Sequence, residues 1–413
     1  MSEKLDEKIL SEVERQFKIL KRGCEEIISE SELKQRLYNS IKESRPLKIK
    51  YGIDPTGDSI HIGHAVVMRK LREFQDLGHE IQFLIGSYTA KIGDPTGKSE
   101  TRKVLTDEQI QHNMKHYMRQ IGKILVVDKL KVVYNHEWLE PLSMEDILKL
   151  MSQFTVSLMT SREDFAKRLS ENKPVSLVEF MYPILQGYDS VALQCDVELG
   201  GTEQKFNVLR GRDLQKAFGQ MPQICMILPI LEGTDGKNKM SKSLNNYISV
   251  EEDPKDMFGK AMSIPDEVMG RYMRLTTNMS DEEILSVERE LLNQTVHPMD
   301  VKRSLAREIV AIYYCEERAI EAENYFNELF SKRSIPQDIA EIEVAYGQVE
   351  IIPLLVEHLN FSKTTSEARR LIQQGAVSIN QVKVDDVKAL IDVTSGMIIK
   401  SGKKNIVKIK GSV

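Results

Sequence analysis

Strand-like and helix-like segments alternate in the first part of this 413-residue chain. Leu47–Ile53 alternates apolar and polar residues up to a Gly/Asp/Pro turn, and Ala65–Phe74 then follows a helical spacing. Further apolar runs typical of strands occupy Ile81–Ile85, Leu130–Tyr134 and Ile224–Leu228. Strands that alternate with helices form parallel sheets with helices on both faces, so we expect a doubly wound α/β domain.

The rest of the sequence predicts two further domains. Amphipathic helical patterns dominate from Pro254 to Val344, where strand signals fade. A linker is expected near Tyr346, followed by a small α/β unit with a helix at Thr365–Gln373 that Gly375 closes. We therefore predict an α/β domain over 1–235, an α-helical domain over 236–345 and a small α/β domain over 346–413.

Charge is distributed unevenly along the chain. The formal net charge is −5, which argues against nucleic-acid binding over the whole surface. From Phe361 to the end, Lys and Arg outnumber Asp and Glu by 6, which leaves −11 on the preceding residues. A basic C-terminal domain on an acidic body predicts local contact with a polyanion. The alternative is an exposed charged face without a partner.

The N-terminal residues and the cysteines predict where the protein works. The first eight residues carry charges of both signs and lack the apolar stretch of a secretory signal. Apolar runs are also too short for a membrane span. The four cysteines are widely scattered, without metal-site spacing or a disulfide framework. We expect a cytoplasmic protein without a membrane segment.

A first motif, His61-Ile62-Gly63-His64, stands where a strand and turn lead into a helix. The free N–H groups and positive dipole end of a helix N-terminus attract phosphate, and Gly63 allows a close approach to the backbone. His61 and His64 can both donate to phosphate oxygens. Two surface histidines or a metal site are the alternatives, but no third metal ligand is evident, so we predict no metal site.

A second motif, Lys239-Met240-Ser241-Lys242-Ser243, follows the flexible, glycine-containing segment Gly233–Gly236. Two lysines three residues apart, accompanied by small hydroxyl residues, form a cationic clamp that suits a pyrophosphate leaving group. A solvated loop is the alternative for this motif alone. Together with the first motif, it favours a nucleotide-using enzyme.

The two motifs in this order resemble those of class I aminoacyl-tRNA synthetases, and nearly the whole chain resembles the bacterial-type tyrosyl-tRNA synthetases. The other segments that carry the resemblance are Gly52–Thr56, Gly93–Lys98 with Arg102 after it, Tyr182-x-x-x-Gln186-x-x-Asp189, Gly200–Gln204, and the S4-type RNA-binding stretch Ser366–Gly375. The resemblance implies a Rossmann-like catalytic domain, an α-helical domain and a small S4-like domain.

The resemblance also implies the reaction and the partners. Tyrosine and ATP with Mg²⁺ would form tyrosyl-adenylate, and the tyrosyl group would pass to tRNA(Tyr) without a prosthetic group. The family is homodimeric. A tryptophanyl-type enzyme of the same subclass and a catalytically inactive RNA-binding paralogue are the alternative interpretations.

The family's functional residues match positions in this sequence. The resemblance implies that tyrosine is bound by Asp94, Tyr182, Gln186 and Asp189; that ATP is bound by Asp54, Gly63, Glu203 and Lys242; that catalysis uses Thr56, His61, His64, Lys98, Arg102, Lys239 and Lys242; and that RNA phosphates meet Arg369, Arg370, Lys383 and Lys403. Tyrosyl-tRNA synthetases are the standard example of this kind of selectivity: phenylalanine lacks the phenol O–H, so its binding would leave a buried acceptor unpaired.

The spacing of the tyrosine-binding residues gives a structural prediction. Tyr182, Gln186 and Asp189 lie four and three residues apart, so they share one helical face. Pro183 is then expected in or near the first turn, where a missing N–H does no harm.

Two positions depart from the family pattern. Lys50 stands where many bacterial members have a tyrosine that joins the acidic residue on the phenol, and one branch of the family has lysine there. Tyr51 follows one residue later, so a strand turns it to the opposite face. Glu203 stands where aspartate is usual and adds a methylene to the proposed ribose contact.

Overall fold

A computed structural model describes residues 2–55, 59–95, 106–331, 339–345, 347–380, 382–402 and 405–412. The chain forms two compact units, Met1–Glu323 and Asn324–Val413. The predicted boundaries after residues 235 and 345 stay predictions.

A six-stranded sheet lies at the centre of the first unit, with the strand order β1-β6-β5-β2-β3-β4. Its strands are β1 (Glu26–Ile28), β2 (Lys48–Ile53), β3 (Glu80–Ile85), β4 (Leu130–Tyr134), β5 (Val197–Gly201) and β6 (Ile224–Leu228). The pairs from β6 to β4 are parallel, whereas β1 joins β6 in the antiparallel sense. The predicted α/β class is confirmed, and the edge strand β1 makes the sheet mixed.

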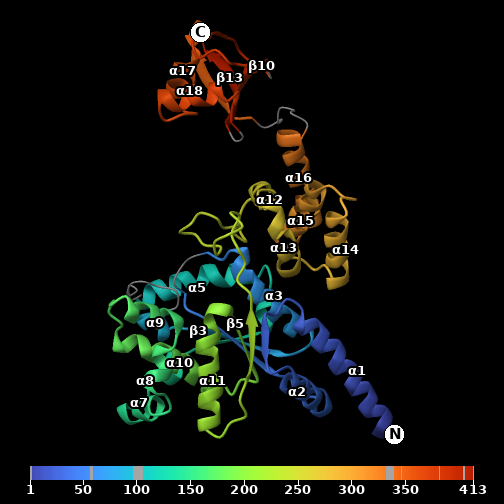
Figure 1. Cartoon of the computed structure of the whole chain (residues 1–413), viewed down its shortest axis with the longest axis vertical. Coiled ribbons are helices and arrows are strands. Elements are labelled where there is room, and N and C mark those ends of the chain that lie inside the picture. The colour runs from blue at the N-terminus through green and yellow to red at the C-terminus, as the bar shows by residue number, and fades with distance from the viewer. Residues whose placement is uncertain are drawn as a thin grey trace. The chain divides into compact units, whose positions relative to one another are not determined.

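Helices cover this sheet. They are α1 (Ser2–Lys21), α2 (Glu30–Glu43), α3 (Ile62–Asp76), α4 (Thr89–Ile92), α5 (Asp107–Ile121), α6 (His136–Leu139), α7 (Met144–Met151), α8 (Val156–Thr160), α9 (Glu163–Ser170), α10 (Leu177–Leu193) and α11 (Lys205–Ala217), with short 3₁₀ turns at Val127–Lys129 and Thr202–Gln204. α3 packs against β3 and β5, and α11 packs against β5 and β6. α10 and α11 lie side by side in the first unit (Figure 1).

The predicted position of Pro183 is wrong. α10 begins at Leu177, where Ser176 and Glu179 form a capping box, so Pro183 lies inside the helix rather than in its first turn. A proline there lacks the N–H that would bond to the carbonyl of Glu179, which usually costs about 3 kcal/mol. Pro183 is buried, so tertiary packing maintains the helix despite the missing bond.

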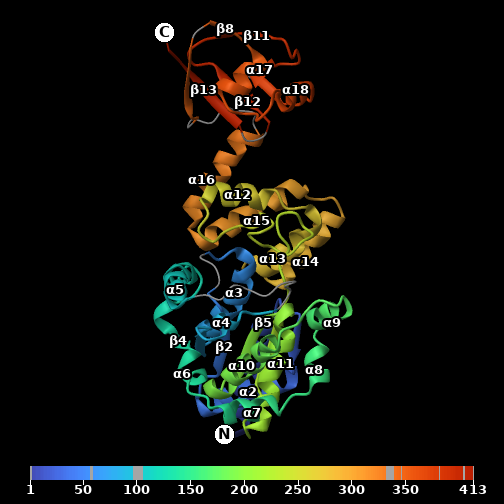
Figure 2. The ribbon, with the colours of Figure 1, turned by 90° about the vertical axis from the view of Figure 1, so that its left-hand side faces the viewer.

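The end of the first unit is helical, as the sequence predicts. Its elements are α12 (Pro254–Met262), a 3₁₀ turn at Asp266–Val268, α13 (Met269–Thr276), α14 (Asp281–Leu292), α15 (Pro298–Tyr313) and the start of α16 (Glu316–Phe326). The last residues of α16 and the π-helical turn at Asn327–Ser331 belong to the second unit. Figure 2 shows α12 to α15 gathered together. α13 also contacts α3, so the helical part packs onto the helix that the first motif begins.

The second unit is small and has its own core. A five-stranded sheet has the order β10-β9-β12-β13-β7, and β11 pairs with β8. The elements are β7 (Glu341–Ala345), β8 (Gly347–Glu350), α17 (Ile351–Pro353), a π-helical turn at Leu354–His358, α18 (Thr365–Gln373), β9 (Val377–Ile379), β10 (Val382–Lys383), β11 (Leu390–Val393), β12 (Ile398–Ser401) and β13 (Asn405–Ser412). α18 has the predicted bounds. β7 already pairs with β13, ahead of the linker expected near residue 346.

In the part of the chain that the structure describes, every helix is too short or too polar to cross a bilayer.

Candidate active site

A cavity of about 720 Å³ opens at the carboxyl ends of the central strands β2 and β5 of the six-stranded sheet. β2, α3, α10 and β5 contribute to its lining, together with the second motif. The predicted residues that line it are Asp54, His61, Gly63, His64, Asp94, Tyr182, Gln186, Asp189, Glu203 and Lys239. Thr56, Lys98 and Arg102 lie outside the described residues. Lys242 does not line the cavity and is exposed.

The two motifs are joined by backbone hydrogen bonds. Ile62 N donates to Ile248 O at 3.0 Å, and Val250 N donates to Ile60 O at 3.1 Å. These bonds tie the start of α3 to the segment that follows the second motif. Met240 is buried beside Gly63: a Cβ added at Gly63 would lie 3.0 Å from His61 Nδ1 and 3.5 Å from Met240 Cβ. A side chain at this position would therefore crowd the His61 ring.

In the first motif His61 is buried and His64 is partly buried, and the lowered pKa values of both rings keep them neutral at pH 7. Their rings stack with centroids 3.7 Å apart, and His61 N donates to His64 Nδ1 at 3.3 Å. Burial, followed by the neighbouring His64 and lysines, lowers the pKa of His61 to about 2. Burial and then Lys239 and Lys242 lower the pKa of His64 to about 4. Neutral imidazoles can still donate N–H hydrogen bonds.

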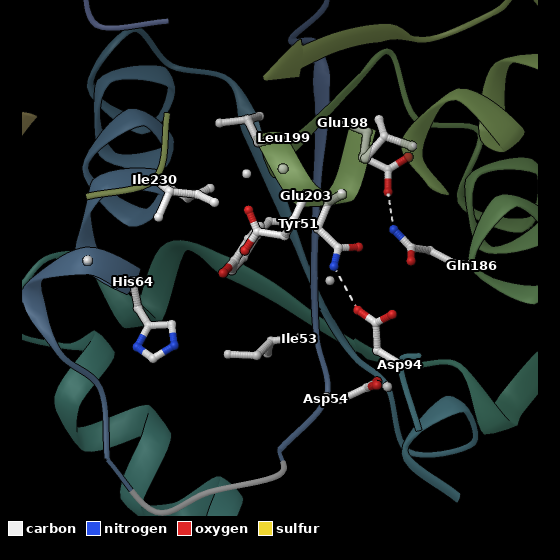
Figure 3. Close-up of a pocket in the computed structure, with 18 of the residues that line it drawn as sticks. Tyr51, Ile53, Asp54, His64, Asp94, Gln186, Glu198, Leu199, Glu203 and Ile230 are labelled. Atoms are coloured by element: carbon white, nitrogen blue, oxygen red, sulfur yellow. Dashed lines mark hydrogen bonds between the residues drawn. The ribbon is translucent and has the colours of Figure 1, made fainter. Parts of the chain in front are cut away.

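Lys239 and Glu203, which both line the cavity, form an ion pair. Lys239 Nζ lies 2.5 Å from Glu203 Oε1, and Glu203 stands close to Tyr51 in the close-up (Figure 3). The longer side chain of Glu203, a departure from the family pattern, thus reaches the clamp lysine. Tyr51 lines this cavity, while Lys50 does not. This difference agrees with the prediction that the side chains of Lys50 and Tyr51 point to opposite faces of the strand.

Asp54 and Asp94 have partners within the site. Tyr182 Oη donates to Asp54 Oδ2 at 2.8 Å, and Thr89 Oγ1 donates to Asp54 Oδ1 at 2.8 Å. Gln204 Nε2 donates to Asp94 Oδ2 at 2.7 Å, one of the bonds drawn in Figure 3. Burial and the nearby Asp54 raise the pKa of Tyr182 well above its ordinary value, so its phenol stays neutral.

Asp189 is the deepest acid of the site. Trp138 Nε1 donates to its Oδ1 at 2.8 Å, and Asn135 Nδ2 donates to its Oδ2 at 3.4 Å. Burial raises the pKa of Asp189 to about 7, although Lys50, Trp138 and Asn135 each oppose the rise. A carboxylate held in this way can accept a hydrogen bond from a phenol at the end of the cavity.

Three buried polar atoms of residues that line the cavity have no hydrogen-bond partner among the described residues. They are His61 Nδ1, Gln186 Oε1 and Glu203 Oε2. Buried polar atoms of proteins are normally paired, so these three mark positions where a polar ligand can complete the bonding. They lie on three different segments of the cavity lining.

Sequence reasoning missed several residues of this site. Trp138, Asn135 and Thr89 support the acids Asp189 and Asp54, and no local pattern distinguishes them because their partners are far away in the sequence. Gln204 belongs to the Gly200–Gln204 stretch already noted, which gave a signal for it. Among the described residues, no group of three His, Cys, Asp or Glu side chains is arranged to bind a metal.

The second unit carries the predicted RNA-binding residues. α18 buries Ala368 and Ile372 and leaves Arg369 and Arg370 exposed. Lys383 is exposed on β10, and its Nζ would lie 3.6 Å from a Cβ added at Gly375, just beyond the end of α18. Lys403 lies outside the described residues. Three of the four predicted cations are thus placed on or near one helix of this unit.

Known proteins resemble both parts of the chain. The family of class I tRNA synthetases (W and Y) matches residues 42–331, and the tyrosine–tRNA ligase SYY-like C-terminal domain matches residues 332–409. Two relatives are the tyrosine–tRNA ligases of Moorella thermoacetica, 46% identical over 97% of both chains, and Carboxydothermus hydrogenoformans, 48% identical over 97% of this chain and 98% of the relative.

Solved structures show the same fold at low identity. The tyrosyl-tRNA synthetase of Archaeoglobus fulgidus complexed with L-tyrosine has a TM-score of 0.59 at 22% identity and covers 75% of this chain and 99% of its own. A truncated mitochondrial tyrosyl-tRNA synthetase of Aspergillus nidulans has a TM-score of 0.64 at 20% identity over 80% and 99%. With the full-length matches at 46–48% identity, the chain belongs to the tyrosine–tRNA ligase family of class I tRNA synthetases.

Proposed function

We propose that the residues gathered at the cavity bind tyrosine and Mg-ATP, form tyrosyl-adenylate and pass the tyrosyl group to tRNA(Tyr). The tyrosine–tRNA ligase activity itself follows from the family membership. The observation that carries the finer proposal is the cavity, which brings together residues from both motifs and from α10. Catalysis by positioning and charge stabilisation suits this site, since the substrate carboxylate can attack the α-phosphorus without a protein nucleophile.

The tyrosine would lie between Asp189 and Asp94. Asp189, supported by Trp138, would accept from the phenol, whereas Asp94, Tyr182 and Gln186 would hold the ammonium group. The unpaired Gln186 Oε1 supports this placement because it is an acceptor that lacks a donor among the described residues.

The ATP would lie towards the two motifs. Asp54, Gly63 and Glu203 would bind the nucleotide, with the Oε2 atom of Glu203 available for a ribose hydroxyl. His61 and His64 would donate to the phosphates as neutral imidazoles. Lys239 and Lys242 would hold the pyrophosphate with its Mg²⁺, together with Thr56, Lys98 and Arg102 if these act as in the family.

Exchange between pyrophosphate and ATP tests this function directly. We expect efficient exchange with tyrosine, and exchange with phenylalanine or tryptophan only at a far lower kcat/KM. Exchange driven by tryptophan would favour the tryptophanyl-type alternative, and no exchange with any of the three would favour the inactive paralogue. The names of the full-length relatives favour tyrosine.

We also propose that the protein is a homodimer that works in the cytoplasm. Large apolar side chains are exposed on neighbouring helices of the first unit; they are Met144, Leu148 and Met151 of α7, Val156 of α8, and Leu177 and Val178 of α10. Monomeric proteins rarely expose a large apolar patch, and a second copy of the chain would cover this one.

Leu148→Glu tests the dimer. Sedimentation should show dimers of the parent protein and monomers of Leu148→Glu at the same concentration. Leu292→Glu on α14 is the matched control, because Leu292 is exposed outside the patch, and it should stay dimeric. A monomeric parent protein would exclude the proposed assembly.

A further inference from the structure

Lys50 is a fully buried lysine with three acceptors. Its Nζ lies 2.9 Å from Gln186 O, 2.8 Å from Ser190 Oγ and 2.9 Å from Glu198 Oε1. Both side chains of the ion pair are almost completely buried, with 0% and 2% of their surfaces exposed. Lys50 and Glu198 are directly paired residues of the parallel strands β2 and β5. The pair therefore belongs to the sheet beneath α10.

The three bonds leave Lys50 no donor for a substrate. A lysine ammonium has three N–H groups, and here each has an acceptor within the protein. Lys50 also does not line the cavity, whereas Glu198 does. The lysine that replaces the family's tyrosine is thus not a second phenol ligand in this structure.

Lys50 instead holds α10 on both sides of Asp189. Two of its acceptors belong to Gln186 and Ser190, which flank Asp189 in the helix. Ser190 Oγ donates in turn to Glu198 Oε2 at 3.1 Å, and Gln223 Nε2 donates to the same oxygen. Figure 3 shows Gln186 directed towards Glu198 as well. The tyrosine-binding face of α10 is therefore fixed to the sheet through this pair.

Lys50 also places a positive charge near Asp189. Burial raises the pKa of Asp189, and Lys50 is the strongest influence that opposes it. Glu198 acts in the other direction but more weakly. The remaining groups that face Asp189 are the neutral donors Trp138 and Asn135 and the neutral phenol of Tyr182.

We propose that Lys50, paired with Glu198, is a positioning residue for phenol recognition: it holds the Gln186–Ser190 segment against the sheet and sets a positive charge beside the Asp189 carboxylate without touching the substrate. This proposal rests on the proposed role of Asp189 as the phenol acceptor. In place of a second side chain that contacts the phenol, Lys50 supports α10 from the side of the sheet.

The test replaces the pair with neutral side chains. Removing Lys50 alone would leave Glu198 buried without its partner, which is strongly destabilising, so the variant is Lys50→Met/Glu198→Gln. Gln at 198 can still accept from Ser190 and Gln223. Pyrophosphate exchange is measured with tyrosine and with phenylalanine, and the ratio of the two kcat/KM values is the readout.

We expect the ratio to fall about tenfold in the double variant, the size expected when one hydrogen bond to a charged group is weakened. The loss should come from a higher KM for tyrosine, with kcat changed little and phenylalanine nearly unaffected. Ser190→Ala removes one acceptor of Lys50 but leaves both charges of the pair in place, and it should lower the ratio about threefold, the size of a weak net hydrogen bond. A folded double variant or a Ser190→Ala variant with the parent ratio would overturn the proposal.

Lys70→Met is the matched control. Lys70 is buried on α3, and its Nζ likewise bonds two carbonyls and a carboxylate, those of Ile19, Arg22 and Glu73. It does not line the cavity. This variant should lose stability but keep the parent ratio, and an equal fall in the ratio would show that any buried lysine has the same effect, which overturns the proposal.

Asp189→Asn separates this inference from the proposed site. If Asp189→Asn keeps the parent ratio, Asp189 is not the phenol acceptor and the site assignment fails. If Asp189→Asn lowers the ratio while the double variant keeps it, the site assignment stands and only the role of Lys50 is excluded.

Discussion

Lys239 and Lys242 differ in their surroundings although they belong to one motif. Lys239 pairs with Glu203 beside the cavity, while Lys242 is exposed and affects the site through its charge on His61 and His64. A lysine that grips pyrophosphate acts mainly in the transition state, where charge on the leaving group grows. Lys242→Ala should therefore lower kcat for tyrosine activation about 100-fold and leave the KM for tyrosine nearly unchanged.

Single-turnover formation of tyrosyl-adenylate is the measurement for Lys242→Ala. Lys237→Ala is the control, because Lys237 is an exposed lysine of the same loop outside the motif. It should retain the parent rate. A large rise in the KM for tyrosine with kcat preserved would mean that Lys242 helps to bind the ground state instead.

Asp189 should make tyrosine activation depend on pH near neutrality. Burial raises its pKa to about 7, so the carboxylate loses its charge as the pH falls through that value. Only the ionised form is a full acceptor for the phenol, and kcat/KM reports the free enzyme. With this pKa, kcat/KM for tyrosine should be roughly fivefold lower at pH 6 than at pH 7.

The histidines of the first motif do not interfere with this measurement, since the lowered pKa values of His61 and His64 keep both neutral between pH 6 and 8. Phenylalanine provides the control because it lacks the phenol O–H. The same slope with phenylalanine would assign the pH dependence to another group.

At the scale of elements, α10 depends on its capping box. Ser176 and Glu179 form this box: Ser176 N donates to Glu179 Oε1 at 2.9 Å, and Glu179 N donates to the backbone oxygen of Ser176 at 3.0 Å. Pro183 weakens the helix interior, so the first turn carries more of its stability. Ser176→Ala should lower the free energy of unfolding by about 1 kcal/mol, measured by urea denaturation.

Ser157→Ala on α8 is the control for this loss, since Ser157 is an exposed helical serine that does not cap a helix. Its effect should stay within about 0.5 kcal/mol. If the change in the free energy of unfolding for Ser176→Ala also stays in that range, the cap does not limit the stability of α10.

Some elements could be predicted from the sequence and others could not. The strands β2, β3, β4 and β6 have apolar runs between turns, which local sequence reveals. β5 was missed because Val197–Gly201 contains two glycines and Glu198, whose place in a buried strand depends on Lys50 from another strand. β1 has only three residues and forms through its pairing with β6.

The same distinction applies to the candidate site. Residues within short motifs, such as His61 and His64, could be predicted because their spacing and types are visible locally. Trp138, the only tryptophan of the chain, meets Asp189 across 51 positions of sequence, so only the fold reveals the contact. Pro183 was misplaced because tertiary packing, rather than local propensity, decides where α10 begins.

At the scale of the whole molecule, we expect the first unit to activate tyrosine and the second unit to help bind tRNA. The cavity belongs entirely to the first unit, whereas the exposed Arg369, Arg370 and Lys383 belong to the second. A chain that ends after Ser331 keeps α16 and its following turn complete and removes the SYY-like C-terminal domain. This truncated chain should form tyrosyl-adenylate at the parent rate but charge tRNA(Tyr) poorly.

The contribution of the second unit should depend on salt, because cations that meet phosphates release counterions on binding. Arg369→Gln/Arg370→Gln in the full-length chain should therefore raise the KM for tRNA and reduce the salt dependence of charging, with pyrophosphate exchange unchanged. Lys388→Gln, an exposed lysine distant in sequence from α18, is the control and should charge tRNA normally. If the chain that ends after Ser331 charges tRNA as well as the full-length protein does, the second unit has no part in binding the RNA, and the cations of α18 must have another role.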